Sequence, residues 1–473
     1  MRDVILVALF VVLLPLAFKH PVIGAYLYTW VSLMNPHKLA YGFARSLPFA
    51  QIAALVVLCM FFMTRKRQNI PWSNPIVVLL LALLTWMTVT SFFAMAPADA
   101  VLDRWFFVMK IQLMLFVTWA LIVEGKQLRV LVWVVTLSVA FFGIKGGVWT
   151  VLTGGGGRVW GPPGGMLQGN NELAVGLVML MPMMYFLRLT ESRAWVRHLL
   201  LFFMISCAFS ILGSQSRGAL LALVSMALFL GLKGKYPVRT SLGIVALLMV
   251  ALAFMPDTWS DRMDTIKTYQ QDGSAMSRIW TWQTLFNAAV DRPFVGAGFV
   301  ADNTAVFSRY APQGGQWEVF AGAVYVAHSI WFQVMGEHGF VGFGLFIGIG
   351  VATWLSAGGV ARRAKALADK PGEGADLALW LPVLMRMVQV SLIGYAIGGS
   401  FLSIAYLDLP YYICGFVVIG YAIVRRVEAG LPVPGTPPNF AAPAPLTATP
   451  RGPSLASTGL KSQVLPPAGK VPR

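Results

Sequence analysis

The feature that most constrains this chain is a series of long apolar runs separated by short loops. Many of the runs reach about 20 residues, which is enough for an α-helix to cross the hydrocarbon core of a bilayer. The composition agrees, because 57% of the 473 residues are hydrophobic and only 12% are charged, whereas a soluble globular protein carries about 25% charged residues. The sequence therefore predicts an all-α fold, namely a polytopic membrane helix bundle.

The apolar runs can be placed one by one as helices. The first two are short, so they form either two thin spans or one span with a half-buried segment, and we expect about 12 transmembrane helices in all. No small-residue cleavage pattern follows the first run, so we expect it to be kept as a helix. The expected helices are 4–18, 21–34, 48–64, 75–95, 105–123, 128–152, 171–188, 196–213, 217–232, 240–256, 328–355, 377–400 and 407–425.

The positions of lysine and arginine orient the bundle. These residues gather in alternate loops, which the positive-inside rule places in the cytoplasm. The long segment 257–327 falls on the opposite face and carries seven acidic residues against five basic ones, so we expect a large helical periplasmic loop. The net charge of +17 is thereby explained without nucleic acid as a partner. The basic loops are 65–67, 126–129, 188–197, 233–239, 362–370 and 425–426, and the opposite loops are 35–47, 96–104, 153–170, 257–327 and 401–406.

The composition changes again near the end of the chain. Eleven of the 28 prolines follow Gly430, and such a segment cannot bury an apolar core. We therefore expect a transmembrane domain at 1–429 and a disordered cytoplasmic tail at 430–473. The three cysteines lie in or beside apolar runs without metal-ligand spacing, so we expect them to pack as small apolar side chains and expect no metal or other cofactor.

Three polar residues stand at the expected outer starts of helices. Arg217 opens the run 217–232, Arg278 opens an amphipathic helix within the long loop, and His328 opens the run 328–355. Unpaired N–H groups and the helix dipole favour anions at such positions; arginines grip phosphate oxygens, and histidine can act as a neutral base. We predict His328, Arg278 and Arg217 as the catalytic residues. The apolar side expected for the loop helix consists of Ile279, Trp282, Phe286 and Ala289.

Each of the three also has a plainer explanation when it is taken alone. An arginine at a helix end often reaches toward lipid headgroups, and a histidine at a membrane interface often serves as a cap or a structural hydrogen-bonding group. The hypothesis of a shared site rests on their common face and their complementary chemistry.

Three further residues are assigned to substrate binding. Arg158 lies in the glycine-rich segment 153–170, which is either a flexible turn or a loop that lets the backbone approach a lipid-linked substrate. Ser329 follows the predicted catalytic histidine. Glu337 is costly in a membrane unless it is paired or lines a cavity. His338 beside it is expected to belong to the packing or to a polar network.

The same residues resemble a known family. His328-Ser329, nine further residues and Gly339-Phe-Val-Gly342 are similar to the H[NSQ]-x9-GxxG pattern of the O-antigen ligase and polymerase superfamily. Arg217-Gly-Ala-Leu-Leu221 resembles that family's RxxxL motif, and Arg278 stands where these ligases have a second arginine. The segments 35–51 and 157–173 are similar to one branch, the probable O-glycosylation ligases associated with the exosortase A system.

The resemblance implies a GT-C-like membrane glycosyltransferase that needs no metal. Such enzymes move a glycan from undecaprenyl diphosphate to an acceptor hydroxyl on a protein, a lipid or a glycan, at the periplasmic face of the bacterial inner membrane. A polysaccharide polymerase stays open as an alternative, because it differs only in the acceptor. A lipid or glycan transporter would usually show inverted repeats, and we find no internal repeat.

Overall fold

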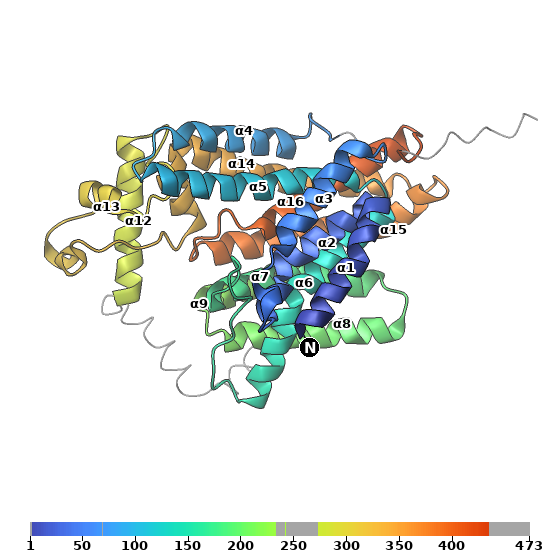
Figure 1. Cartoon of the computed structure of the whole chain (residues 1–473), viewed down its shortest axis with the longest axis horizontal. Coiled ribbons are helices and arrows are strands. Elements are labelled where there is room, and N and C mark those ends of the chain that lie inside the picture. Colours follow the sequence, from blue (N-terminus) through green and yellow to red (C-terminus); the bar gives the residue numbers. More distant parts are fainter. Residues whose placement is uncertain (1, 69, 233–241, 243–272, 435–473) are drawn as a thin grey trace, which may run out of the picture. The chain divides into compact units, whose positions relative to one another are not determined.

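The computed structural model describes residues 2–68, 70–232, 242 and 273–434. Regular structure in these residues is helical throughout, which confirms the all-α prediction (Figure 1). The helix expected at 240–256 lies outside the described residues, as does the first part of the long loop. The helices are α1 (Arg2–Lys19), α2 (Pro21–Met34), α3 (Phe49–Met63), α4 (Pro75–Ser91), α5 (Ala98–Leu121), α6 (Gly125–Leu152), α7 (Asn170–Thr190), α8 (Ala194–Gly213), α9 (Arg217–Leu232), α12 (Gly273–Asp291), α13 (Thr304–Tyr310), α14 (Ile330–Lys365), α15 (Glu373–Gly399) and α16 (Asp408–Glu428), with 3₁₀ turns η1 (Pro36–Leu39), η2 (Phe43–Ser46) and η4 (Gly315–Phe320).

The expected positions of the other helices are confirmed, with two notable differences in length. Helix α5 begins at Ala98 rather than at 105, and α14 continues to Lys365 rather than ending at 355. Both extensions carry charged residues, so the apolar run predicts only the part of each helix that can lie in the hydrocarbon core. Backbone hydrogen bonding continues the helix into polar sequence at either end.

Six helices among the described residues are long and apolar enough to cross a membrane, namely α6, α7, α8, α14, α15 and α16. The shorter apolar helices are α2, α3, α4 and α9. The structure thus has the helices of a multi-pass membrane protein. The expected total of about 12 spans and the periplasmic position of the long loop stay predictions.

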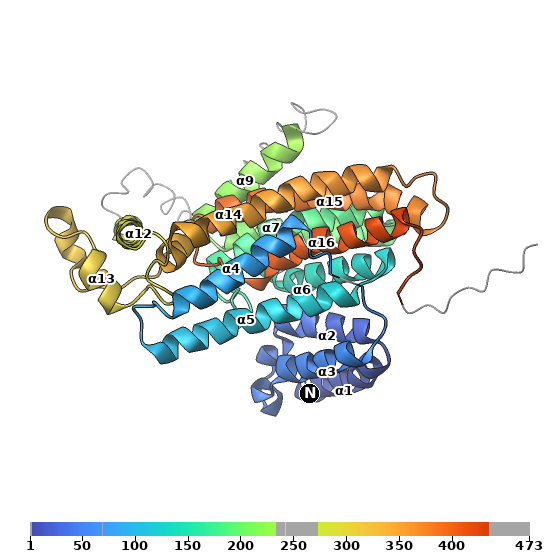
Figure 2. The ribbon, with the colours of Figure 1, turned by 90° about the horizontal axis from the view of Figure 1, so that it is seen from above.

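Helices α7, α15 and α16 lie at the centre of the main hydrophobic core. Helices α6 and α8 pack closely at Gly147, where a Cβ atom would lie 1.8 Å from the Ser206 carbonyl oxygen, and small residues of this kind let two backbones approach. Helices α1, α2 and α3 form a second cluster at one side of the bundle (Figure 2). Helices α9 and α14 contribute Ala219, Ala222, Ile330 and Val334 to the main core, so both are anchored in it.

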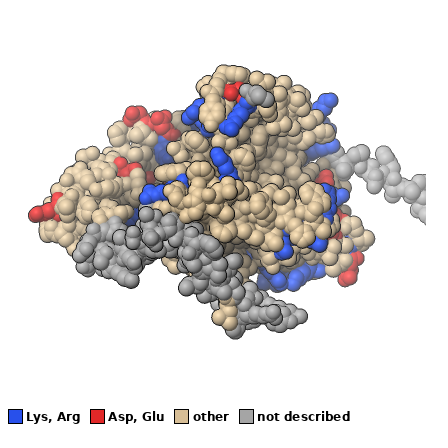
Figure 3. All heavy atoms as spheres, turned by 90° about the horizontal axis from the view of Figure 1, so that it is seen from below, with Lys and Arg blue, Asp and Glu red and all other residues tan. Residues whose placement is uncertain are grey.

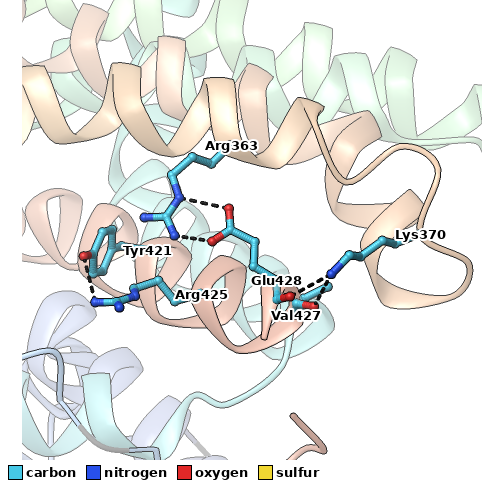
Figure 4. A network of polar contacts seen from close by, with 6 residues as sticks. All are labelled: Arg363, Lys370, Tyr421, Arg425, Val427 and Glu428. Atoms are coloured by element: carbon cyan, nitrogen blue, oxygen red, sulfur yellow. Dashed lines mark hydrogen bonds and ion pairs between the residues drawn. The ribbon is translucent and has the colours of Figure 1, made fainter. Parts of the chain in front are cut away.

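Basic residues cap one end of the bundle. At this end, Arg363 of α14 pairs with Glu428 of α16, and the Lys370 ammonium group donates to the Val427 and Glu428 carbonyl oxygens at 3.1 and 2.8 Å (Figure 4). Arg129 at the start of α6 donates to the Thr190 carbonyl at the end of α7, 2.9 Å away. Figure 3 shows lysine and arginine side chains toward the middle of the molecule and at the end opposite α12 and α13, with acidic side chains at both ends. Loops expected on one face thus do meet at one end.

The segment 273–327 forms a small cap at the other end of the bundle, which we call the end cap. Figures 1 and 2 show its helix α12 running across the end of α14, on which it packs. The end cap has its own apolar cluster, which includes Trp280, Phe307 and Phe320. Met95, just before α5, and Phe332 of α14 pack against this cluster, which joins the end cap to the bundle.

The predicted apolar face of α12 is wrong in part. Phe286 is 44% exposed, and the buried residues of the helix are Trp280, Thr281, Thr284, Leu285, Ala288 and Ala289. The buried stripe is rotated relative to the predicted one and includes two threonines, Thr281 and Thr284. Each threonine hydroxyl donates to a backbone carbonyl within the helix, so it can be buried without an unpaired polar group.

The chain divides into a unit of residues 1–435 and a second of residues 436–473. All of the second unit lies outside the described residues. The division expected at 429 and the disordered cytoplasmic tail stay predictions.

Candidate active site

His328 lies immediately before α14, in the left-handed backbone region with φ of 46°. Its backbone N–H donates to the Ser403 hydroxyl oxygen, 2.7 Å away. The Trp282 indole N–H, from α12, donates to the preceding Ala327 carbonyl at 2.8 Å. The histidine backbone is therefore held from two sides, by the end cap and by the segment between α15 and α16.

Backbone strain gathers around this position. Four non-glycine residues of the described chain have clearly positive φ. Asn35 is the ordinary case, a helix C-cap. The others are Gln215 just before α9, Val300 in the end cap, and His328, with φ of 57°, 60° and 46°. For a β-branched residue such as Val300 this conformation is an outlier, and such strain tends to persist at functional sites.

The short segment 400–407, between α15 and α16, contacts the starts of both α9 and α14. Besides holding His328, it places the Ser400 hydroxyl 2.8 Å from the donating Trp331 indole of α14. Phe401 packs against Gly218 in the first turn of α9, where a Cβ atom would lie 3.0 Å from the phenylalanine ring. The starts of α9 and α14 are thus fixed against one common segment.

Helix α14 contains a break that fits it to the end cap. Gly339 has φ of 65° and ψ of −170°, which is not helical. At this break the Ala297 and Gly298 N–H groups donate to the Gly336 and Glu337 carbonyls, and the Phe340 N–H donates to the Pro293 carbonyl, each at 2.8 Å. Gly339, the first glycine of the H[NSQ]-x9-GxxG pattern, therefore has a structural role, which is to open α14 so that the end cap can dock.

Glu337 and His338, the two residues directly before the break, belong to a buried polar network. The Tyr406 hydroxyl donates to the Glu337 carboxylate and lies 2.9 Å from the His338 Nε2 atom. The His338 Nδ1 atom lies 2.7 Å from the Thr90 hydroxyl of α4. The predicted network role of His338 is confirmed, and Glu337 is both paired and exposed to a cavity, as expected.

Arg278 is electrostatically linked to His328. Burial lowers the pKa of His328, and the Arg278 charge lowers it further. The same guanidinium acts on the Glu172 carboxylate, in the first turn of α7. An arginine of α12, the predicted base and a carboxylate of α7 therefore share one electrostatic environment, and the histidine is favoured in its neutral form.

Arg217 is the first residue of α9 and is half-buried. Its helix joins the site through the packing of Gly218 on the 400–407 segment. Arg158 is exposed, and its Nε atom donates to the Gln215 side-chain oxygen at 3.3 Å. The glycine-rich loop thus reaches the strained segment in front of Arg217. Ser329 is only 1% exposed and is the N-cap of α14, without a side-chain capping bond.

A polar cavity of about 240 Å³ lies beside His328. It shares Ala327 and Ser403 with the histidine's surroundings. Most of the residues that line it were not predicted from the sequence. The residues that line it are Arg104, Leu285, Val300, Ala301, Asp302, Tyr325, Val326, Ala327, Gln333, Glu337 and Ser403.

Arg104 and Asp302 are the charged residues of this wall that sequence reasoning did not single out. The Arg104 guanidinium lies 5.7 Å from the ring centroids of both Phe107 and Tyr406. Its charge acts on the carboxyl groups of Asp302 and Glu337. Burial raises the pKa of Asp302, and Arg104 opposes the rise. Arg104 could have been found from the sequence as an arginine near the start of a long apolar helix on the expected outer face.

Among the described residues, no group of three or more His, Cys, Asp or Glu side chains is arranged to hold a metal ion. The polar groups of the site are instead arginines, single carboxylates, an amide and hydroxyls. Such a set can bind anions and sugar hydroxyls through hydrogen bonds.

Residues 199–347 match the family O-Antigen ligase. The match spans the three predicted catalytic residues and Glu337, and it supports the O-antigen ligase superfamily and a ligase- or polymerase-type membrane enzyme. Residues 1–192 match a family of unknown function, DUF5935. No curated protein matches the chain.

Proposed function

We propose that this chain is a glycosyltransferase that moves a glycan from undecaprenyl diphosphate to an acceptor hydroxyl at the periplasmic face of the inner membrane. Arg217 and Arg278 bind the diphosphate, and the imidazole of His328 accepts the proton of the hydroxyl. Arg158 and Ser329 assist in substrate binding, and Glu337 lines the adjoining cavity. By its motifs the enzyme belongs with the exosortase-associated O-glycosylation ligases and works without a metal ion.

The proposed step is a single displacement. The acceptor oxygen forms a bond to the anomeric carbon while the bond from that carbon to the diphosphate oxygen breaks. The diphosphate keeps the electron pair, and its growing negative charge is stabilised by the two guanidinium groups. The hydroxyl proton passes to His328. Attack from the face opposite the leaving group inverts the anomeric centre.

The observation that carries the proposal is that the Arg278 charge acts on His328, with both residues inside the O-Antigen ligase match. A base must be unprotonated to accept a proton, and the neighbouring arginine and the burial both favour the neutral imidazole. The same arginine supplies positive charge where the leaving group would develop negative charge. One local arrangement thus suits both halves of the reaction.

The test is transfer by the full chain reconstituted in lipid with an undecaprenyl-diphosphate-linked oligosaccharide and candidate acceptors, with products identified by mass spectrometry. We expect His328→Ala and Arg278→Ala to lose at least about 100-fold in rate, the lower range for removing a general base. Arg309→Ala is the matched control, because Arg309 is an exposed end-cap arginine that pairs with Asp291. Undiminished transfer by His328→Ala would overturn the assignment, and the acceptor used separates a ligase from a polymerase.

A further inference from the structure

We propose that residues 323–327 of the end cap, which we call the edge segment, bind an extended polypeptide of another protein by β-strand addition. The pairing uses the main chain of the edge segment, and side chains of the partner enter a cavity beside it. This interaction surface goes beyond the proposed transfer reaction and holds whether or not the chain is a glycosyltransferase. The partner that fits carries a lysine or an arginine.

The first argument is the conformation of the edge segment. Its five residues read Ala-Val-Tyr-Val-Ala, and β-branched and aromatic residues of this kind favour strands. The segment contains no helix, turn or bend, and none of its residues has positive φ. Val324, Tyr325 and Val326 are 37%, 37% and 42% exposed. The edge segment is therefore extended and lies at the surface, with no strand beside it in the part of the chain that the structure describes.

The second argument is the state of its backbone. Within the described residues, the N–H and C=O groups of Val324, Tyr325 and Val326 make no hydrogen bond. The Ala327 carbonyl accepts from the Trp282 indole of α12. Alternate residues of an extended chain direct their N–H and C=O groups to opposite edges, so the edge of Ala327 faces α12 and the opposite edge is that of Val324 and Val326. Those two valines offer two donors and two acceptors at the spacing that a paired β-strand uses.

The third argument is that this open edge has no protection against pairing. Exposed strand edges usually carry a lysine or another charged residue, or a proline, which prevents the addition of a further strand. The run from Val319 to Ala327 contains no charged residue and no proline. An unprotected edge of this kind is the surface to which an extended peptide is added when recognition works through main-chain hydrogen bonds.

A cavity of about 340 Å³ beside the edge segment indicates which partner fits. Ala323 and Val324 form part of its wall together with Trp280 and Trp317, so the wall offers aromatic surface to an apolar side chain. Glu318 is the one charged residue that lines it. Its carboxylate is exposed and makes no hydrogen bond or ion pair among the described residues, so it favours a basic residue of the partner. A second copy of this chain suits the edge less, because the run from Glu318 to Ala327 has no basic residue to offer.

The edge segment also joins this surface to the candidate active site. The Tyr325 ring lies 6.0 Å from the Trp280 ring of α12, which holds the segment on the end cap. Residues 325–327 line the other cavity, the one beside His328, and His328 follows them directly. A polypeptide paired with the edge segment therefore lies next to the candidate active site.

The test is hydrogen exchange of the full chain in lipid nanodiscs, followed by mass spectrometry at the level of single residues. The probe is an acetylated peptide of alternating valine and threonine that also contains one tyrosine and one lysine. At a peptide concentration of about ten times Kd, we expect exchange at the Val324 and Val326 amides to slow by about tenfold. The Tyr325 amide should change little, because only the open edge is paired.

Two comparisons separate main-chain pairing from general association. The same peptide with alternate backbone nitrogens methylated keeps its side chains but cannot donate to the edge, and it should bind at least about tenfold more weakly. Val324→Pro removes one N–H of the open edge and should weaken the unmethylated peptide by a similar factor. The methylated peptide tests the pairing even if Val324→Pro does not fold.

A further pair of variants tests the charge. Glu318→Gln should weaken binding of the lysine peptide by about threefold, in the range of an exposed ion pair. Asp369→Asn is the matched control, because Asp369 is an exposed carboxylate in the loop between α14 and α15, and it should leave binding unchanged.

The outcomes separate this inference from the proposed function. Slower exchange at Val324 and Val326 that is lost with the methylated peptide supports strand addition, whether or not His328→Ala abolishes transfer. Unchanged exchange at these two amides, or equal binding of the methylated peptide, overturns it. Slow exchange without peptide that depends on protein concentration would show that a second copy occupies the edge, and would overturn it as well.

Discussion

Replacing Gly339 by alanine should disrupt the site from within helix α14. The residue has φ of 65° and ψ of −170°, a region that essentially only glycine occupies. A Cβ atom there would lie 2.4 Å from the Phe294 carbonyl oxygen and 2.5 Å from that of Pro293. Backbone strain of about 1–3 kcal/mol and overpacking of about 1–3 kcal/mol together predict a loss of about 2–6 kcal/mol.

The matched control is Gly344→Ala, five residues further along the same helix. A Cβ atom at Gly344 meets nothing within 4 Å, and alanine is favoured over glycine in a helix by about 1 kcal/mol. This control should therefore be neutral or slightly stabilising. Unfolding in detergent, followed by circular dichroism during titration with SDS, gives the two free-energy changes side by side.

The transfer assay completes the experiment. Because Gly339 lets the end cap dock next to Glu337, we expect Gly339→Ala to lose activity even at temperatures where it is still folded, whereas Gly344→Ala stays active. Equal stability of the two variants would refute the role assigned to the break in α14.

Two further predictions concern His328. Since the pKa of His328 is lowered by burial and by Arg278, the neutral base persists below its ordinary value of about 6.5, and transfer should fall only below that pH. In Arg278→Gln the pKa of His328 should rise, so the residual activity should begin to fall at a higher pH than in the wild type. Arg278→Lys keeps the positive charge and should keep the wild-type pH profile. Identical pH profiles in the wild type and both variants would contradict the electrostatic link. Ser403→Ala removes the hydroxyl that accepts the hydrogen bond from the His328 backbone N–H. It should lower kcat by about tenfold, the effect of losing one hydrogen bond of about 1.4 kcal/mol. Ser403→Thr keeps the hydroxyl and should restore kcat. Ser400→Ala removes the bonds of that hydroxyl to the Trp331 indole and the Ala396 carbonyl but none to His328, so it should have a smaller effect on kcat. Equal losses in the two variants would argue for general loosening of the segment.

Much of this architecture followed from the sequence because membrane helices are specified locally. A run of apolar residues near 20 long is read as a span from its own composition, and basic loops orient it independently of what the rest of the chain does. The predicted helices therefore agree with the structure in nearly every described case, and the segments that carry Arg104 and Ser403, which were expected on one face, line one cavity. The motif around His328 predicted a catalytic residue at the start of α14.

Tertiary structure decided everything that depends on which side chains meet across that face. The strained backbone of Val300 and His328, the break at Gly339, and the donation of the His328 N–H to Ser403 arise only when the end cap and the 400–407 segment are packed on the bundle. The buried face of α12 was also mispredicted, since threonines that bond within the helix can be buried as readily as apolar residues. Sequence periodicity reports how one helix is solvated, whereas a site is a set of contacts between residues far apart in the chain, and only folding brings those contacts into being.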